Sequence, residues 1–264
     1  MSLIISPNVK RIYNNHFKKI LNYTPDSILE YHDILDEKVI IINIQNKEYI
    51  DYLQNQFNIW FNYFKLKGLV ENVSITGIKE NMNDGQGSSR YSTNSPKLSE
   101  YLTDILNSFN LNIIADFHED FNSVNNKCKY SKVSDYFRFM KYENGGQHYP
   151  HYDSDFVIDK NTITKYSLVM YLNNCEDGEL VFCKDSRLLK IEIPFDSFSH
   201  KDTSDWDRQV KEEEILLKIK PTAGMIVLFP HTLCHAVLPF TGKERNIVRG
   251  DLEFVKTWYW SKNS

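Results

Sequence analysis

The sequence lacks any run of about eighteen apolar residues, the length that a membrane-spanning helix needs. Its N-terminus, Met1-Ser-Leu-Ile-Ile-Ser-Pro, also lacks the basic start and long apolar stretch of a secretory signal. Positive charge is not in excess, since 35 acidic residues face 31 basic ones and the net charge is −4. These absences argue against a membrane partner and against broad nucleic-acid binding. They predict a cytoplasmic protein, with a nuclear location left open.

Cysteine is scarce, and its spacing forms no motif. The four cysteines, at 128, 175, 183 and 234, match neither a CxxC metal pattern nor a dense disulfide framework. We therefore expect reduced thiols with a structural role. The remaining composition, 41% hydrophobic and 25% charged over 264 residues, is that of a globular protein. It excludes a disordered chain, a collagen and a coiled coil.

The first part of the chain is predicted to be mostly helical. From Glu48 to Lys67, apolar residues recur at steps of three and four, as on one buried face of a helix. A second helix is predicted after Ser95, with Pro96 at its first position. The stretch 81–90 between them is predicted to be a loop. We expect residues 1–110 to support the rest of the chain or to recognise a partner.

After about Leu111, short runs rich in Tyr, Phe, Val and Ile are separated by Asn, Gly, Asp and Pro. No crossover helix or internal repeat is evident, so an antiparallel sandwich or barrel is favoured over a parallel sheet. The predicted fold class is α+β, mainly β, with residues 111–264 as the core. Strands are expected at 135–142, 165–172, 180–182, 189–193, 215–219, 225–229 and 245–254.

The segment Tyr142-Glu-Asn-Gly-Gly-Gln-His-Tyr-Pro-His-Tyr-Asp153 contains a candidate metal site. Side chains two residues apart on extended backbone leave the same face, so His151 and Asp153 could grip one ion. An imidazole and a carboxylate are two thirds of the 2-His-1-carboxylate triad, which leaves half of an octahedral iron(II) open. Alone, a His-x-Asp pair is a weak signal, because surface chance explains most such pairs.

A third ligand must come from a distant strand, and the stretch Met225 to Arg245 offers one. His235 follows a predicted strand and a turn, and Arg245 lies ten residues later. The arginine matters because an α-keto dicarboxylic acid that chelates iron through its keto end has a second carboxylate some distance away. A guanidinium is a planar, permanently charged and bidentate partner for that carboxylate.

With these residues in place, the chain resembles the 2-oxoglutarate- and iron(II)-dependent dioxygenases, specifically the prolyl 4-hydroxylase-like branch. The resemblance covers roughly residues 135–254 and implies a double-stranded β-helix, or jelly-roll barrel, buttressed here by N-terminal helices. Four stretches carry it in the family's order: Tyr142–Asp153, Tyr166–Asn174, Asp177–Phe182 and Lys220–Phe229, the last running on to His235 and Arg245.

The resemblance also implies a role for each matching residue. The iron(II) ligands would be His151, Asp153 and His235. Arg245 would bind the distal carboxylate of 2-oxoglutarate, and Tyr171 would hydrogen-bond the same group. Tyr142 would line the cosubstrate pocket, although a plain packing role stays open for both tyrosines.

The implied reaction is oxidative decarboxylation of 2-oxoglutarate by O2 to succinate and CO2, coupled to hydroxylation of a substrate C–H bond. Ascorbate is a candidate reductant. A peptidyl proline or another protein side chain is the favoured target, with a small molecule as the runner-up. Two other readings stay open, a non-catalytic β-helix binding module and an oxidative nucleic-acid demethylase. The intact triad argues against the first and the negative net charge against the second.

The chain departs from the family in two places. Asp177-Gly-Glu-Leu stands where the family more often has Gly-Gly-Glu-Thr, and the spacing from His235 to Gly242 is one residue short. The second departure leaves open whether Lys243 assists or replaces Arg245. Arg245 is preferred because it begins a predicted strand, whereas Lys243 lies in the preceding turn.

Three further residues are candidates for substrate or supporting contacts: Arg249, His148 and Trp206. If Arg245 points into the barrel, the period of two also places Arg249 inside, where it needs an anionic ligand or a carboxylate such as Asp251. Both His148 and His231 lack the ligand spacing, but His148 could touch substrate.

Trp206 lies in a long charged stretch, Ser197 to Glu214, between two predicted strands. We expect this stretch to form a flap beside the mouth of the site, with a solvated surface loop as the plain alternative.

Overall fold

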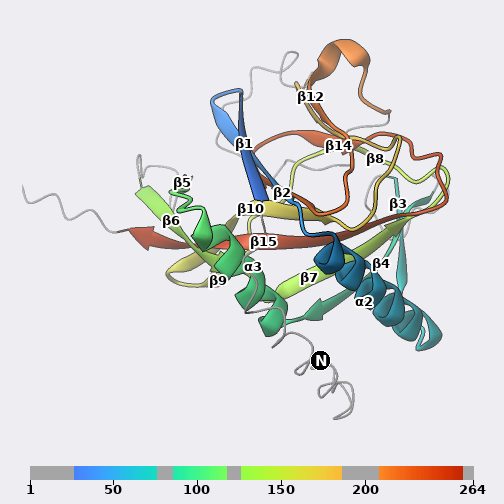
Figure 1. Cartoon of the computed structure of the whole chain (residues 1–264). Coiled ribbons are helices and arrows are strands. Elements are labelled where there is room, and N and C mark those ends of the chain that lie inside the picture. Colours follow the sequence, from blue (N-terminus) through green and yellow to red (C-terminus); the bar gives the residue numbers. More distant parts are fainter. Residues whose placement is uncertain (1–26, 76–85, 118–125, 186–207, 258–264) are drawn as a thin grey trace, which may run out of the picture.

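The computed structural model describes residues 27–75, 86–117, 126–185 and 208–257 (Figure 1). These residues form two antiparallel sheets, two α-helices and one short 3-10 helix. The sheets face each other, and the α-helices lie on the outer side of the larger sheet (Figure 1).

The larger sheet has eleven strands in the described part of the chain. Its main path runs through β1 (Ser27–Ile34), β2 (Glu37–Ile44), β13 (Met225–Pro230), β10 (Thr162–Tyr171), β15 (Arg245–Thr257), β7 (Tyr136–Tyr142), β4 (Gln86–Asn94) and β3 (Glu71–Ser74). Three more strands extend it: β6 (Asn126–Val133) beside β15, β5 (Ile114–Phe117) beside β6, and β9 (Val157–Asp159) beside β10.

The smaller sheet consists of four strands in the order β12 (Ile215–Ile219), β11 (Leu180–Cys183), β14 (His235–Val237) and β8 (His148–His151). The 3-10 helix η4 (Glu212–Glu214) leads into β12. Between the sheets is a hydrophobic layer in which the rings of Phe182 and Phe229 are 5.1 Å apart. This layer joins the two sheets into one barrel.

Alternation along the central strands determines which side chains reach the space between the sheets. On β10, Leu168 and Met170 pack toward the helices, while Val169 and Tyr171 face the smaller sheet. On β15, Val248 likewise packs toward the helices. The odd-numbered residues of β15 from 245 to 249 therefore point into the barrel.

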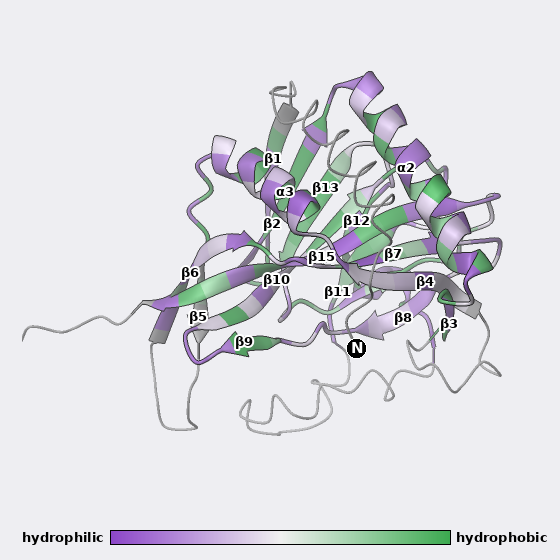
Figure 2. Cartoon of the chain, turned by 90° about the horizontal axis from the view of Figure 1, so that it is seen from below, coloured by the Kyte–Doolittle hydropathy of each residue, from purple (hydrophilic) through white to green (hydrophobic). Residues whose placement is uncertain are grey.

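Helices α2 (Lys47–Leu66) and α3 (Pro96–Ser108) cover the outer face of the larger sheet (Figures 1 and 2). Asn46 caps α2, because its side chain accepts a hydrogen bond of 2.8 Å from the Tyr49 N–H. The buried face of α2 carries Leu53, Phe57 and Phe61, at the predicted spacing. Both predicted helices therefore exist: α2 agrees with the prediction within one residue at each end, and α3 begins at Pro96 as predicted.

Residues 27–110 also contribute strands that the sequence analysis did not identify. β2 pairs with β13, and β4 pairs with β7, so this region extends the same sheet as the core. The predicted loop over residues 81–90 is wrong from residue 86, where β4 begins. Polar Gln86-Gly-Ser-Ser-Arg90 has no apolar alternation, and its pairing with β3 and β7 holds it extended.

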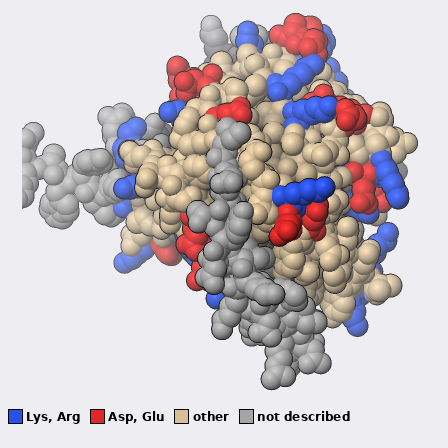
Figure 3. All heavy atoms as spheres, in the orientation of Figure 1, with Lys and Arg blue, Asp and Glu red and all other residues tan. Residues whose placement is uncertain are grey.

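The architecture is a double-stranded β-helix of class α+β, mainly β, as predicted. Six of the seven predicted strands are present, and the remaining one, at 189–193, lies outside the described residues. Among the described helices, none is both long and apolar enough to cross a membrane. On the face seen in Figure 3, basic and acidic side chains are interspersed without a broad region of one sign.

Candidate active site

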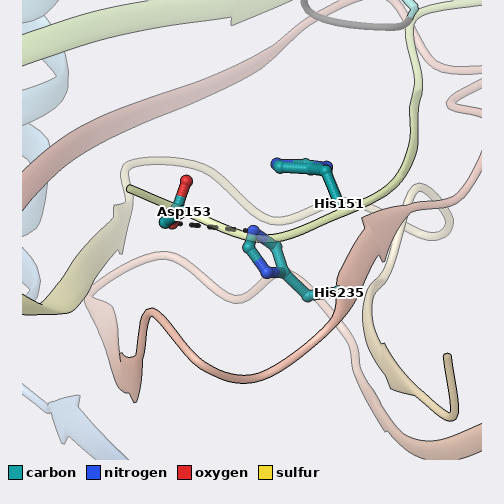
Figure 4. A group of neighbouring side chains, drawn as sticks. All are labelled: His151, Asp153 and His235. Carbon is teal, nitrogen blue, oxygen red and sulfur yellow. Dashed lines mark ion pairs between the residues drawn. The ribbon is translucent and has the colours of Figure 1, made fainter. Parts of the chain in front are cut away.

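Three of the predicted site residues meet between the sheets. His151 ends β8 and His235 begins β14, and these two residues are register partners in the smaller sheet. Asp153 lies in the segment that follows β8. Their ligand atoms all lie within 4.8 Å of one another, and His235 Nε2 is 3.7 Å from Asp153 Oδ2 (Figure 4). Two nitrogens and one carboxylate oxygen can therefore converge on a single ion.

Backbone carbonyls orient both imidazoles. The Nδ1 atom of His151 is 2.7 Å from the Tyr149 carbonyl oxygen, and that of His235 is 3.0 Å from the Leu233 carbonyl oxygen. When Nδ1–H donates to a carbonyl, the lone pair remains on Nε2. Burial lowers the pKa of both rings, that of His235 to about 3. Both rings are therefore neutral near pH 7, as metal ligands must be.

Asp153 is ionised although it is buried. Burial alone would raise its pKa, but the Arg249 guanidinium holds the pKa of Asp153 well below its ordinary value. Arg249 Nη2 lies 2.6 Å from Oδ1, and the Ser167 hydroxyl donates to Oδ2. The donor set of two neutral imidazoles and one carboxylate is the facial triad of non-haem iron(II) sites. The residues present thus fit such a metal.

A cavity of about 220 Å³ adjoins the three residues. Met140, Val169 and Ile247 line it from the larger sheet, and Leu180 and Val237 from the region of the smaller sheet. The cavity therefore combines apolar walls with polar groups that can orient a ligand. Its polar and charged lining consists of Arg90, Arg138, Tyr142, His148, His151, Asp153, Tyr171, His235, Arg245 and Arg249.

Arg245 is the most completely buried cation at the cavity, with 1% of its surface exposed. Its Cζ lies 3.9 Å from the centroid of the Tyr142 ring, and its Nη1 donates to the Gly178 carbonyl. Within the described residues, no carboxylate pairs with Arg245, and its Nε has no hydrogen-bond partner. A buried permanent cation without an anion is costly, so this end of the cavity suits an anionic ligand.

The neighbouring candidate, Lys243, is exposed and does not line the cavity. The difference follows from the register, in which Arg245 begins β15 opposite Tyr142 while Lys243 belongs to the turn before it. The departure at Asp177-Gly-Glu-Leu also has a structural reason. The Asp177 carboxylate accepts hydrogen bonds from the Thr241 N–H at 3.1 and 3.2 Å, which ties the Gly178 turn to the segment before β15.

The remaining predicted residues have different surroundings. Tyr142 and Tyr171 are each 2% exposed in the cavity wall, and burial raises the pKa of both phenols, so both keep their protons. His148 lines the cavity, and burial lowers its pKa to about 3. His231 does not line the cavity and instead contacts Asp155 at 3.0 Å. Trp206 and residues 197–207 of its stretch lie outside the described residues.

Sequence reasoning missed Ser167 and Arg138. Ser167 is fully buried and contacts Asp153, and Arg138 on β7 faces the cavity beside Arg249. A signal was available for both, because each is a polar residue at an inward position of a predicted strand. Ser167 stands two residues before Val169, and Arg138 two before Met140.

A β-helix with this cluster and a buried arginine at its cavity defines the class of non-haem iron oxygenases that use an α-keto acid. Residues 137–250 match the model of the 2OG-Fe(II) oxygenase superfamily, where 2OG is 2-oxoglutarate. This part of the chain is therefore similar to that superfamily, whose members require iron(II), 2-oxoglutarate and O2. No sequence among curated proteins matches the chain.

Solved structures with a similar fold are distant in sequence. A prolyl-4-hydroxylase from Pseudomonas putida is 14% identical, with a TM-score of 0.45 and coverage of 93% of this chain and 100% of that one. A prolyl hydroxylase from Trichoplax adhaerens, solved with a hypoxia inducible factor peptide fragment, is 12% identical, with a TM-score of 0.46 and 94% of each chain covered. HygX from Streptomyces hygroscopicus, with nickel and 2-oxoglutarate bound, is 10% identical, with a TM-score of 0.45 and coverage of 97% and 89%.

Proposed function

We propose that the chain hydroxylates a C–H bond of its substrate and converts 2-oxoglutarate and O2 into succinate and CO2. One observation carries the proposal: a complete His-Asp-His cluster and a buried arginine without a carboxylate partner share one cavity. Either feature alone has ordinary structural explanations. Together they match the two recognition tasks of such an enzyme, which are metal binding and cosubstrate binding.

Each residue has a role in this proposal. His151, Asp153 and His235 hold iron(II), which together with 2-oxoglutarate supplies the activation of O2 and the oxidation of the C–H bond. Arg245 takes the distal carboxylate of 2-oxoglutarate in a charge-assisted, bidentate contact. Tyr171 and Tyr142 keep their phenolic protons and can donate to the same carboxylate. Met140, Val169 and Ile247 form an apolar wall beside these residues.

The size of the cavity supports a protein or peptide side chain as the target. A volume of about 220 Å³ is small beside the 300–1,000 Å³ or so of sites that enclose a whole drug-sized ligand. The cosubstrate must share this space. Room therefore remains for one small group that projects from a larger substrate, and a prolyl side chain is such a group. A small-molecule hydroxylase is the second candidate.

We also propose that residues 27–110 support the barrel. The contribution of β2 and β4 to the larger sheet and the cover from α2 and α3 support this role.

The decisive experiment is a turnover assay on the full chain. Protein loaded with iron(II) without oxygen is mixed with 2-oxoglutarate, air and either a peptide library or a metabolite pool. Succinate is quantified, and mass spectrometry searches for products heavier by one oxygen. We expect succinate above a His235→Ala control and an oxygenated peptide. Succinate that stays at the level of this control in every pool would contradict the proposal and favour a binding module.

A further inference from the structure

Arg249 is a second buried arginine on β15, and the proposed function does not yet use it. It lies four residues after Arg245, and its register partners are Arg138 on β7 and Val169 on β10. Its Nη2 atom is 2.6 Å from Asp153 Oδ1 and 3.2 Å from Ser167 Oγ. It is thus in direct contact with a proposed metal ligand.

We propose that Arg249 is a positioning residue that fixes the Asp153 carboxylate so that Oδ2 faces the metal. The two oxygens of Asp153 have different surroundings. Arg249 engages Oδ1, while Oδ2 lies 3.7 Å from His235 Nε2, on the side of the second imidazole. The inference rests on the proposed function, because it presumes that Asp153 is a metal ligand.

Asp153 needs such a restraint more than the histidines do. His151 and His235 belong to paired strands, and a carbonyl orients each ring. Asp153 instead follows the end of β8, in a segment without ladder pairing. An unrestrained carboxylate could rotate and lose its metal-facing geometry. A guanidinium and the Ser167 hydroxyl hold one oxygen each.

A second carboxylate, that of Asp251, lies near the guanidinium of Arg249, with its Oδ1 3.6 Å from Nη2. Asp251 also contacts Arg138 at 3.3 Å and His231 Nε2 at 3.4 Å. Asp155 lies on the far side of His231. Charges of alternating sign thus run from Asp153 toward Asp155, which lowers the cost of burying Arg249. The extended network leaves Arg249 little freedom to turn toward another ligand.

Two effects of Arg249 on metal affinity have opposite signs. A fixed cation near the site repels a divalent ion, whereas a well-oriented carboxylate binds it more tightly. Loss of a group that orients a metal ligand typically reduces affinity by about 10- to 100-fold. We infer that orientation dominates, because the contact with Oδ1 is short and the neighbouring carboxylate of Asp251 offsets part of the repulsion.

The test measures cobalt(II) binding without turnover, by anaerobic calorimetry and by the visible spectrum of the bound ion. Arg249→Met removes the charge and the donors, while Arg249→Lys keeps the charge but not the planar fork. Arg138→Met is the matched control, since Arg138 belongs to the same network but makes no contact with Asp153. We expect Arg249→Met to weaken cobalt binding about 10- to 100-fold. Arg249→Lys should bind more weakly than wild type but better than Arg249→Met.

The spectrum separates positioning from a general structural role. Saturated Arg249→Met should show altered cobalt bands, whereas Arg138→Met should keep the wild-type bands. In an Arg249→Ala protein, added methylguanidinium should restore part of the affinity. If Arg249→Met does not fold, as judged by thermal melting, Arg249→Lys carries the same comparison.

Cobalt affinity in Arg249→Met equal to or tighter than wild type would overturn the inference. So would unchanged metal binding combined with a raised 2-oxoglutarate requirement, which would make Arg249 an anion anchor. Asp153→Ala tests the underlying proposal separately. If Asp153→Ala binds cobalt like wild type, the ligand assignment fails. If it loses cobalt while Arg249→Met does not, only the role of Arg249 fails.

Discussion

The two sheets that enclose the cavity contribute opposite chemistry. The smaller sheet provides imidazoles, from β8 and β14, whereas the larger sheet provides guanidiniums, from β4, β7 and β15. Burial acts on both kinds of group. It lowers the pKa of His235 to about 3, so the ring is neutral, but arginine keeps its charge even when it is buried. The same desolvated space thus holds neutral metal ligands on one wall and permanent cations on the other.

This division explains how one barrel can bind a metal cation and the dianion 2-oxoglutarate side by side. A metal ion is best bound by unprotonated donors, and a carboxylate by groups that cannot lose their charge. Asp153 and Arg249 join the two walls through their contact of 2.6 Å, and Arg245 joins them again by donating to the Gly178 carbonyl. Substitutions on the smaller sheet should therefore affect metal binding, and those on the larger sheet cosubstrate binding, with Arg249 as the exception because it contacts Asp153.

The largest effect is expected on the smaller sheet. His235→Ala removes one of three metal ligands and should abolish both iron binding and succinate production, while the fold survives. Metal content after anaerobic loading and succinate formation are the measurements. His231→Ala is the matched control, because His231 is as buried but does not line the cavity. Loss of iron in His231→Ala but not in His235→Ala would show that the ligand assignment is wrong.

On the larger sheet, Arg245→Ala should raise the 2-oxoglutarate requirement steeply while iron binding persists. Loss of the partner of a buried carboxylate costs about 2 to 5 kcal/mol, or roughly 30- to 4,000-fold in affinity. A cosubstrate titration of succinate formation measures this change. Lys243→Ala serves as the control and should change the requirement much less, since Lys243 is exposed. The reverse ranking would move the anchor to the turn before β15.

The site was more predictable from the sequence than the fold that carries it. His151 and Asp153 are two residues apart on extended chain, and Arg245 follows His235 after ten residues, so both signals are local. Alternation from Arg245 also predicts an inward Arg249, which lines the cavity between Asp153 and Asp251. Which carboxylate would meet it depended on the fold, because Asp153 and Arg249 are 96 residues apart (249 − 153).

The strands before residue 95 were harder to predict for physical reasons. β2 contains Val39-Ile-Ile-Ile42, a continuous apolar run that is buried on both faces and shows no period of two. β4 is hard to predict for a different reason, because its sequence is almost entirely polar and has no alternation of apolar and polar residues. Both strands obtain their pairing from distant partners, β13 and β7, that follow in the chain. Local pattern cannot reveal such pairing.

A smaller effect is expected where the two walls meet at Gly178. This residue has φ +73°, and a Cβ there would lie 2.8 Å from Arg245 Nη1. Gly178→Ala should therefore displace the guanidinium and raise the 2-oxoglutarate requirement by about tenfold, equivalent to about 1.4 kcal/mol. Gly68→Ala is the control for backbone strain, because Gly68 has φ +68° with nothing within 4 Å of its Cβ. Equal cosubstrate requirements in the two variants would contradict a steric link to Arg245.

The smallest effect is expected at His148, a buried imidazole of the smaller sheet that is not a proposed ligand, and it is an effect on stability. Burial, followed by the neighbouring His151, lowers its pKa to about 3, against about 6.5 in the unfolded chain. Between pH 3 and pH 6.5, His148 is therefore protonated in the unfolded chain but neutral in the folded protein. The contribution of neutral His148 to stability is complete above pH 6.5 and is lost as the pH falls toward 3.

The slope of this loss is about 1.4 kcal/mol per pH unit for one proton. His148→Gln can still donate to the Ile75 carbonyl, which lies 3.3 Å from Nδ1 in the wild type, but it cannot take up the proton. Urea unfolding of the metal-free proteins measures the free energy of unfolding. Between pH 6 and pH 4, this free energy should fall less steeply in His148→Gln than in wild type, by about 1.4 kcal/mol per pH unit.

At pH 7.5 position 148 carries no proton charge in either state of either protein, so the protonation of His148 makes no contribution to stability there. His231, whose pKa is raised against the effect of burial by Asp155 and Asp251, acts in the opposite direction but equally in both. Parallel stability curves from pH 6 to pH 4 would mean that His148 takes up a proton within the folded barrel.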